Sequence, residues 1–349
     1  EDIYYALMDS LKKANTLLAS GTDPINSDIL MGGSALRWQE FANGLRLRLL
    51  MRMSNVTGAK VDVGAEMSAI AADPATYPLF ATYSDQAAFQ FLPDNGFEFP
   101  AYHNSPIGDY HLSTTLETNL KLLNDPRIAY FAMPTPASLG TGTPVYAGVP
   151  NGIGTAETSW NGGANNQSQE APILMPVAGY PFSSPIAAQG MLMSCAEVQF
   201  ILAEGKERGL ITTGNDAETY YLKGIHDQFS YDSSRLALMT LPFPADITAS
   251  PAYYTQPAVA YTGTTDEKLY KIRIQRWFSM FYTGFEGWSE WRRTGVPKET
   301  KVGPSSAIPQ WPRRIRYPLS EQTVNTVNYN AALAVQGPDD LVTHVWWNK

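Results

Sequence analysis

The sequence predicts an all-α fold in which paired helices carry a large, loop-rich layer with little β structure. Apolar residues recur at the 3.6-residue spacing of helices near both ends of the chain. Between them lies a stretch rich in Pro, Gly, Asn and aromatic residues, without such a period. The helices come in pairs, although no exact 34-residue repeat is visible. We therefore expect a repeat-like helical scaffold with irregular insertions, forming one domain over residues 1–349.

Residues 1–72 are predicted to form the first part of the scaffold, as three antiparallel helices joined by short polar links. The first helix begins near Ile3 and stops at Ser20-Gly21. The second covers about residues 34–56 and the third about residues 61–72, where Asp73-Pro74 ends it. Four arginines of the second helix, Arg37, Arg46, Arg48 and Arg52, are compatible with an anion site. We favour the alternative that they join helices through buried carboxylates.

Residues 73–190 change character and are predicted to form a loop-rich insertion. One helix is expected over residues 113–123, with Ser113 as its N-cap. The rest is rich in turn formers, and loops of this length inside a compact domain are usually functional or disordered. The aromatic residues embedded in it favour an ordered surface layer; they include Trp160, Tyr146, Tyr180 and Phe182.

Helical periodicity returns in residues 191–349, which are predicted to hold the C-terminal helices and an irregular tail. Helices are expected over about residues 191–208, 216–231 and 266–282, with a short one over residues 321–325. Cys195 falls within the first of these among apolar neighbours, where a thiol behaves as a small hydrophobic group. No histidine lies near it in sequence to make it a nucleophile.

The composition excludes several classes of protein. The chain has 25 Lys and Arg against 33 Asp and Glu, a net charge of −8, which argues against nucleic acid as its main partner. No apolar run is long enough to span a membrane, and one cysteine rules out an internal disulfide or a multi-thiolate metal site. No glycine-rich phosphate loop is present, so we expect no cofactor.

The first residues are already in a helical pattern and show no signal peptide. Two explanations stay open at this point: a cytoplasmic protein, or a sequence that starts downstream of the natural start. A start inside a helix favours the second.

Two candidate sites for chemistry have simpler alternatives. Glu286 and Glu290 flank Trp288, so they could act as the acid and base of a glycoside hydrolase. However, carboxylates four residues apart share one helix face, and arginines follow at once, so ion pairing is favoured. His103, Asp109 and His111 could offer three metal ligands, but their spacing matches no standard zinc pattern. We expect neither a catalytic pair nor a metal.

Low charge and many aromatic residues suggest a surface that binds by stacking and polar contacts, which needs exposed aromatic planes beside hydrogen-bonding amides. Trp38 and Trp277 follow the helical period and are expected in the core. Trp160 follows no period and precedes four amides, so it is the leading candidate, together with Asn161 and Asn165. Tyr180 and Tyr83 are further candidates of this kind. The alternative for Trp160 is that its side chain only fixes its own loop to the scaffold.

Three groups of segments resemble the SusD/RagB family, and in particular its SusD-like variant. Residues 38–52 resemble the Trp-x-x-Phe-Ala-Asn-Ser-Leu-Lys-Leu-Arg helix of that family, and residues 196–204 its Ala-Glu-x-x-Phe-x-x-Ala-Glu helix. The C-terminal pattern is matched by Ile274-Gln275, Glu286, Trp288, residues 291–297 and 313–318, Asn325, residues 328–330 and 345–347. Their order and spacing extend over nearly the whole chain.

The resemblance implies a tetratricopeptide-like helical scaffold wrapped by irregular loops. It also implies an outer-membrane lipoprotein of Bacteroidetes-type bacteria that faces outward. Such proteins cover a SusC-like TonB-dependent transporter barrel and capture glycans, or sometimes peptides, for import. Family members usually extend further at the N-terminus, so the lipid-bearing cysteine and first helices are expected to be absent here, and Cys195 is no substitute. The family transfers no catalytic residue and no fixed ligand residue to this chain.

The predicted function is therefore cell-surface glycan binding for delivery to the transporter. A secreted glycoside hydrolase and a peptide-binding scaffold are the two alternatives from other classes.

Overall fold

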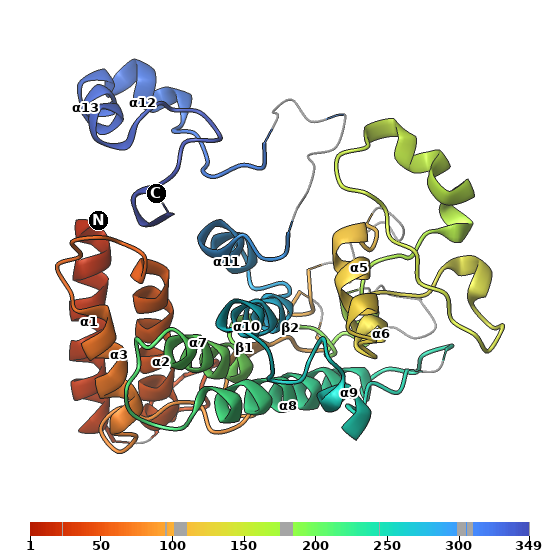
Figure 1. Ribbon diagram of the computed structural model, residues 1–349, viewed down its shortest axis with the longest axis horizontal. Coiled ribbons are helices and arrows are strands. Elements are labelled where there is room, and N and C mark those ends of the chain that lie inside the picture. The colour runs from red at the N-terminus through yellow and green to blue at the C-terminus, as the bar shows by residue number, and fades with distance from the viewer. Residues whose placement is uncertain are drawn as a thin grey trace.

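The computed structural model is dominated by helices, with a single two-stranded sheet among the described residues (Figure 1). It describes residues 1–22, 24–94, 96–100, 110–174, 184–243, 245–298, 305 and 310–348. Within these ranges no helix is long and apolar enough to cross a membrane. The prediction of a mainly helical protein with little β structure is confirmed.

The first three helices are α1 (Asp2–Ala19), α2 (Ala35–Met53) and α3 (Val63–Ala72), close to the predicted ranges. Side chains define two of their starts: Ser34 accepts a hydrogen bond from the Arg37 amide, and Asp62 accepts one from the Ala65 amide. The contact between α1 and α2 contains a buried amide, because the Asn15 carbonyl oxygen accepts hydrogen bonds from Gln39 and Asn43. Satisfied polar groups of this kind fix how two helices meet.

The centre of the molecule is built from α7 (Cys195–Glu207), α8 (Ala217–Leu236) and α10 (Thr265–Ser279), which pack side by side (Figure 1). Their first residues follow N-cap side chains at Ser194, Asp216 and Thr264, and the last of these forms a capping box with Glu267. The short α9 (Pro251–Thr255) links α8 to α10. Most of the large, fully buried side chains of the core come from these helices and α2.

The predicted helix over residues 191–208 begins later than expected. Gln189–Met193 forms strand β2, which pairs antiparallel with β1 (Ala87–Gln90), and Ser194 then caps α7. Cys195 is thus the first residue of α7 and not a mid-helix residue, although it is fully buried as expected. The apolar residues 191–193 continue the helical spacing of α7 toward the N-terminus. Ser194, which follows them, is the N-cap at which the helix starts, so residues 191–193 lie outside it.

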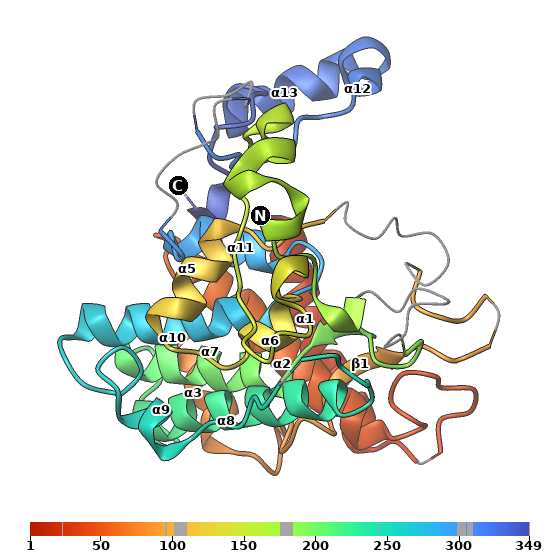
Figure 2. The same ribbon diagram turned by 90° about the vertical axis from the view of Figure 1, so that its right-hand side faces the viewer.

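In the described residues between α3 and β2, the elements besides β1 are short. These are α5 (Thr114–Leu122), α6 (Ile128–Phe131), and the 3-10 helices η1 (Pro136–Ser138), η2 (Gly154–Gly162), η3 (Ala164–Asn166) and η4 (Pro172–Leu174). The predicted helix at residues 113–123 is α5, and its cap is Ser113 as expected. These elements lie on the right-hand side of the central helices in Figure 1, the side that faces the viewer in Figure 2.

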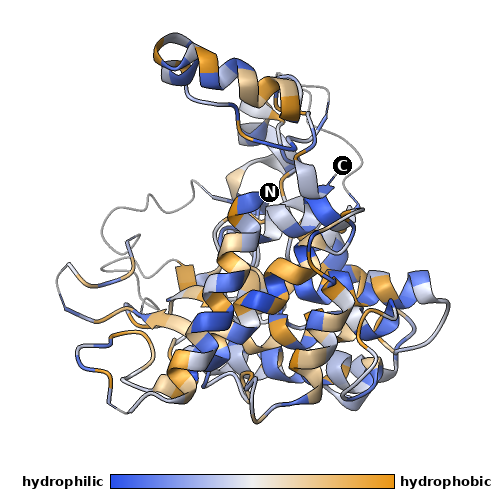
Figure 3. Cartoon of the chain, turned by 90° about the vertical axis from the view of Figure 1, so that its left-hand side faces the viewer, coloured by the Kyte–Doolittle hydropathy of each residue, from blue (hydrophilic) through white to orange (hydrophobic). Residues whose placement is uncertain are grey.

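The C-terminal part contains α11 (Glu286–Thr294), α12 (Leu319–Val324), α13 (Thr326–Gln336) and the 3-10 helix η5 (Trp346–Asn348). The predicted helix over residues 321–325 corresponds to α12, but α13 was not predicted. Val324 of α12 and Val327 and Val335 of α13 are exposed, so these helices lack the buried face that a periodic pattern reveals. Figure 3 shows hydrophobic and hydrophilic colours mixed along the helices at its top. The two chain ends lie close together, with the rings of Tyr4 and Trp346 5.0 Å apart.

The expectation that Trp38 and Trp277 belong to the core needs a correction for Trp277. Both side chains are half-buried and pack against the core. Trp277 also forms part of the wall of a cavity beside α11, so only some of its ring faces other core residues. Helical spacing cannot distinguish these two cases, because a cavity wall and a core contact lie on the same helix face.

Candidate functional site

The Trp160 side chain is held at the surface by its own loop. It belongs to η2, where the chain kinks: Trp160 is extended, and Asn161 has a positive φ of 51°. The indole Nε1 donates a hydrogen bond of 3.1 Å to the Gly148 carbonyl oxygen, while 41% of the residue stays exposed. The ring is thus both fixed and accessible. A fixed aromatic plane can stack on a sugar ring with little loss of side-chain entropy.

The amides after Trp160 divide into two roles. Gln167 is buried, and its amide nitrogen donates to the carbonyl oxygens of Glu157 (2.7 Å) and Trp160 (2.8 Å). Asn161 donates to the Asn166 carbonyl oxygen at 2.7 Å. These two amides therefore hold the loop. Asn161, Asn165 and Asn166 are all exposed, so three amide side chains of the group face solvent beside the indole. Together they form a rigid surface, which we call the Trp160 platform: Trp160, Asn161, Asn165, Asn166 and Gln167.

Tyr83, another predicted site residue, does not join this platform. Tyr83 is half-buried against Tyr231 of α8, with ring centres 6.5 Å apart, and lines a small cavity of about 130 Å³ with Arg37 and Arg235. Tyr180 lies outside the described residues. The structure therefore brings together Trp160, Asn161 and Asn165, whereas Tyr83 is placed among other elements.

Of the three predicted metal ligands, the structure describes only His111. His103 and Asp109 lie outside the described residues, and His111 Nδ1 is 3.1 Å from a Glu157 carboxylate oxygen. In the ranges that the structure describes, no three potential metal ligands come together. Glu157 was not singled out in the sequence, because a pairing with His111 across 46 positions leaves no local pattern. This pair joins η2 to the start of α5.

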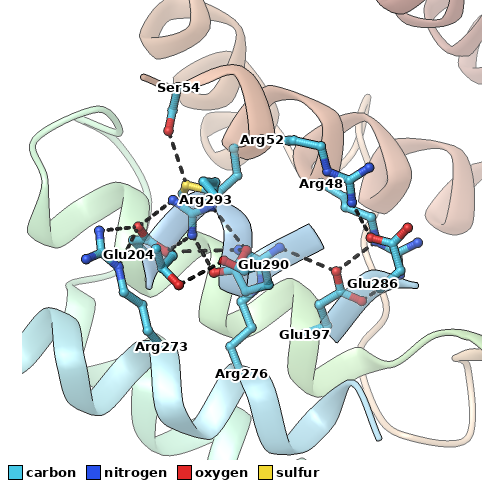
Figure 4. A network of polar contacts seen from close by, with 12 residues as sticks. Arg48, Arg52, Ser54, Glu197, Glu204, Arg273, Arg276, Glu286, Glu290 and Arg293 are labelled. Atoms are coloured by element: carbon cyan, nitrogen blue, oxygen red, sulfur yellow. Dashed lines mark hydrogen bonds and ion pairs between the residues drawn. The ribbon is translucent and has the colours of Figure 1, made fainter. Parts of the chain in front are cut away.

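Glu286 and Glu290, the candidate catalytic pair, are held by arginines (Figure 4). Glu286 forms an ion pair with Arg52. Glu290 is buried and contacts Arg293 at 2.5 Å and Arg276 at 3.1 Å. A general acid or base must reach its substrate, whereas these carboxylates are engaged within the protein. The interpretation as structural ion pairs is the one that the geometry supports.

These contacts belong to a larger ion-pair network between α2, α7, α10 and α11 (Figure 4). Glu197 of α7 accepts two hydrogen bonds from Arg48, at 2.8 and 2.6 Å. Glu204 accepts from Arg293, at 2.8 and 2.5 Å, and from Arg273 at 2.8 Å. Burial alone would raise the pKa of Glu204, but the arginines, led by Arg293, hold that pKa below its ordinary range.

The expectation that arginines of α2 tie helices together is confirmed for three of the four. Arg48 and Arg52 pair with Glu197 and Glu286, and Arg46 pairs with Glu66 of α3. Arg37 differs, because it donates to the backbone carbonyl oxygens of Met31, Ser84 and Gln86. Of these carboxylate partners only Glu197 is buried, whereas Glu66 and Glu286 are partly exposed. Glu204, the second glutamate of the motif at residues 196–204, is buried too, but its partners Arg273 and Arg293 come from α10 and α11.

A second aromatic feature was missed in the sequence. Four tryptophans line a cavity of about 560 Å³ between α10, α11 and the segment around Pro312. They are Trp277, Trp288, Trp291 and Trp311. The tryptophans are separated by up to 34 positions, and Leu341, which also lines the cavity, is 64 positions from Trp277. The local sequence does not show such a meeting.

The fold and these sites define a helical scaffold protein with aromatic surfaces for a ligand. The match to the SusD-like family model, described as "Starch-binding associating with outer membrane", covers residues 1–318. The chain belongs to this family, and the resemblance found in its motifs is confirmed. No protein with a curated function matches the chain.

Solved structures agree with this assignment. A SusD homologue from Bacteroides fragilis is 26% identical, with a TM-score of 0.81 over 100% of this chain and 75% of the homologue. A Bacteroides vulgatus protein is 26% identical, with a TM-score of 0.85 over 99% and 75% of the two chains. A chitin-binding protein is also 26% identical, with a TM-score of 0.76 over 99% and 72%.

Proposed function

We propose that this protein binds a polysaccharide or oligosaccharide at the cell surface and delivers it to a TonB-dependent transporter of the outer membrane. The observation that carries the proposal is the Trp160 platform, where a fixed indole is 41% exposed beside amide groups. Membership of a starch-binding family and the likeness to a chitin-binding protein support a carbohydrate ligand.

The platform suits the chemistry of sugars. A pyranose ring has an apolar C–H face, which stacks on an indole, and a rim of hydroxyl groups, which hydrogen-bond to amides. Stacking contributes on the order of 1 kcal/mol per ring, by analogy with aromatic pairs. Asn161, Asn165 and Asn166 are the amides of the platform that are exposed to a ligand. Tyr180 stays a candidate for a further contact.

The test is affinity electrophoresis of the purified chain in gels that contain starch, soluble chitin derivatives or plant polysaccharides. The parent protein is expected to be retarded by its ligand, and Trp160→Ala to lose most of that retardation while melting at the same temperature. Phe97→Ala is the matched control, since Phe97 is an exposed aromatic residue outside the platform. Equal retardation of the parent and Trp160→Ala would remove the platform from the site.

The partner and the location follow from the family and need their own test. We propose a SusC-like barrel as the partner, and a lipid anchor that holds the protein on the external face of the outer membrane. A tagged form of the complete protein, purified from native membranes in mild detergent, should retain a barrel of the TonB-dependent class. Purification without any barrel would contradict the partnership.

We also propose that the protein is not an enzyme. The support is the engagement of Glu286 and Glu290 by Arg52, Arg276 and Arg293. Incubation with the glycan that retards the protein should release no reducing sugar. Release that is abolished by Glu286→Gln, in a variant that remains folded, would favour the glycoside hydrolase instead.

A further inference from the structure

The tryptophan-lined cavity has walls suited to a ring-shaped ligand. Its volume of about 560 Å³ lies within the range of small-molecule sites. Trp288 is fixed by a 2.9 Å hydrogen bond from its indole nitrogen to the Pro312 carbonyl oxygen. The Trp311 indole nitrogen, in contrast, is buried and has no hydrogen-bond partner among the described residues. An unpaired buried donor is costly unless a ligand satisfies it.

Two arginines outside the cavity wall, Arg292 and Arg313, stack on indoles that belong to it, and Arg292 also lies 4.7 Å from the ring centre of Trp347. The Arg292 guanidinium lies 3.8 Å from the ring centre of Trp288, and the Arg313 guanidinium lies 4.3 Å from that of Trp291. Such cation–π contacts hold a guanidinium in place without neutralising its charge. Arg292 donates to the Arg313 carbonyl oxygen at 2.9 Å and to the Ser289 hydroxyl at 3.1 Å. Both of these partners are uncharged.

The charge around the cavity is unbalanced. Among the ion pairs of the described residues, none involves Arg292 or Arg313, and Glu286 is already engaged by Arg52. Arg314, in the wall itself, is paired with Asp339 at 3.0 Å. Partial burial, followed by the repulsion of Arg52, lowers the pKa of Arg292 to about 10. Partial burial also lowers the pKa of Arg313, and no nearby carboxylate opposes this change.

We infer that this cavity binds a saccharide that carries a carboxylate or sulfate group, with its ring against the tryptophans and its charge at Arg292 and Arg313. The indoles match the apolar face of a pyranose, and the guanidinium fork matches the two oxygens of a carboxylate or sulfate. The inference rests on the proposed function, carbohydrate binding, and names an acidic class of sugar. It concerns a site distinct from the Trp160 platform.

The charge complementarity is local. The chain as a whole carries −8 and repels anions at long range. An anionic ligand is therefore expected to gain its affinity from the arginines that flank the cavity, not from the overall field. Trp277 and Gly287 also line an adjoining cavity of about 570 Å³, so a saccharide of more than one ring has room beside the first.

The test is calorimetric titration of the whole chain with defined probes at low ionic strength. They are a galacturonic acid trisaccharide, a heparin-derived tetrasaccharide, the neutral galactose trisaccharide and a hexaglutamate peptide. At least one acidic saccharide should bind, more tightly than the neutral one, and added salt should weaken it. The carboxylate and sulfate probes distinguish the two sources of charge.

The decisive variant is Arg313→Gln, which should weaken the acidic saccharide about tenfold, equivalent to about 1.4 kcal/mol. Arg316→Gln is the matched control, because Arg316 is an exposed arginine of the same segment that, among the described residues, does not stack on an indole as Arg313 does. It should bind as the parent does. Melting temperatures show whether each variant remains folded.

Each contrary result has a separate meaning. Equal affinity of the parent and Arg313→Gln, or equal affinity for the neutral trisaccharide, would overturn the inference. Arg313-dependent binding of hexaglutamate alone would identify a peptide site and overturn it as well. If no acidic probe binds but a neutral glycan binds through Trp160, this inference fails and the proposed function stands. If no carbohydrate binds at all, both fail.

Discussion

Within the ion-pair network of the described residues, Glu204 is the carboxylate with the most arginine contacts. It is fully buried and accepts hydrogen bonds from Arg273 and Arg293, with Arg276 at 4.0 Å. Glu204→Gln removes the negative charge but keeps the shape, which leaves the buried Arg293 with Glu290 as its remaining carboxylate. We expect the free energy of unfolding to fall by about 3–5 kcal/mol, the usual effect of removing one partner from a buried pair.

Urea denaturation followed by circular dichroism measures this loss. Glu218→Gln is the control, since Glu218 is an exposed glutamate on α8, and its effect should stay within about 0.5 kcal/mol. A similar midpoint for Glu204→Gln and the parent would show that the network contributes little to stability.

Asp232 gives the molecule a dependence on pH. It is fully buried on α8, and one carboxylate oxygen accepts from Gln228 at 2.7 Å, while the other has no partner among the described residues. Burial raises its pKa from 3.8 to about 7. A carboxyl with a higher pKa in the folded state stabilises the fold below pH 3.8, and this contribution disappears as the pH rises through 7.

Asp232→Asn removes that pH dependence. The variant should exceed the parent in free energy of unfolding at pH 8, by up to about 4 kcal/mol from the size of the pKa difference. Near pH 4 the two proteins should be similar, so the comparison at that pH is the internal control. Thermal unfolding at both pH values provides the measurement. A variant that is less stable than the parent at pH 8 would show that Asp232 is needed in its ionised form.

At the scale of elements, the contact between α7 and α8 depends on a glycine. A Cβ atom at Gly224 would lie 2.6 Å from the Phe200 ring, and Phe200 is fully buried. A glycine-to-alanine change inside a helix normally stabilises by about 1 kcal/mol. Here the fixed ring opposes it, so we expect Gly224→Ala to destabilise by about 1–3 kcal/mol, as overpacked cores do.

Gly287→Ala is the matched control for this change. Gly287 also lies within a helix, but the nearest atom to its added Cβ would be 3.8 Å away, an ordinary contact. The two variants should therefore shift the denaturation midpoint in opposite directions. If both variants were more stable than the parent, the Phe200 ring would have to move away from α8 at little cost. That result would contradict the expectation that this buried ring is fixed.

The sequence predicts the helices that have an N-cap side chain and one buried face. It does not predict β2 or α13, which lack one or both of these features. α2, α3 and α5 lie within a few residues of their predicted ranges, because serine or aspartate caps mark their starts. β2 was assigned to a helix, since its pairing with β1 joins residues about a hundred positions apart. α13 has no buried residue, so its helical period could not be recognised.

The candidate site shows the same division. Trp160 and its amides are neighbours in sequence, so their meeting in one loop could be expected. The tryptophan cavity joins α10, α11 and residues 311–341, which only the tertiary fold brings together. The helical spacing of Trp277 predicts a core position. Such spacing shows which face of a helix a residue lies on, but not whether that face packs against the core or lines a cavity. The hydrogen bond from Trp160 to Gly148 likewise depends on the tertiary fold.

For the whole molecule, the ion-pair network joins segments from both ends of the chain. Arg48 and Arg52 come from α2, and Glu286, Glu290 and Arg293 come from α11. If α2 and α11 separated, the ion pairs between them would break and leave partly buried charges without partners. We therefore expect one cooperative unfolding transition. Far-ultraviolet circular dichroism, which reports all helices, and tryptophan fluorescence should give the same midpoint in urea. Two separated midpoints would indicate that parts of the chain unfold independently.

The spacing of the two glutamates in α7 also has a consequence for misassembly. Glu197 and Glu204 are seven residues apart, two helical turns, so they lie on one face and meet arginines from different helices. If α7 slid along its neighbours by one turn, about 5.4 Å, both carboxylates would lose their partners at once. Apolar contacts could re-form after such a shift, but two buried carboxylates without arginine partners would cost free energy. The two glutamates therefore disfavour packings in which α7 is shifted along its neighbours.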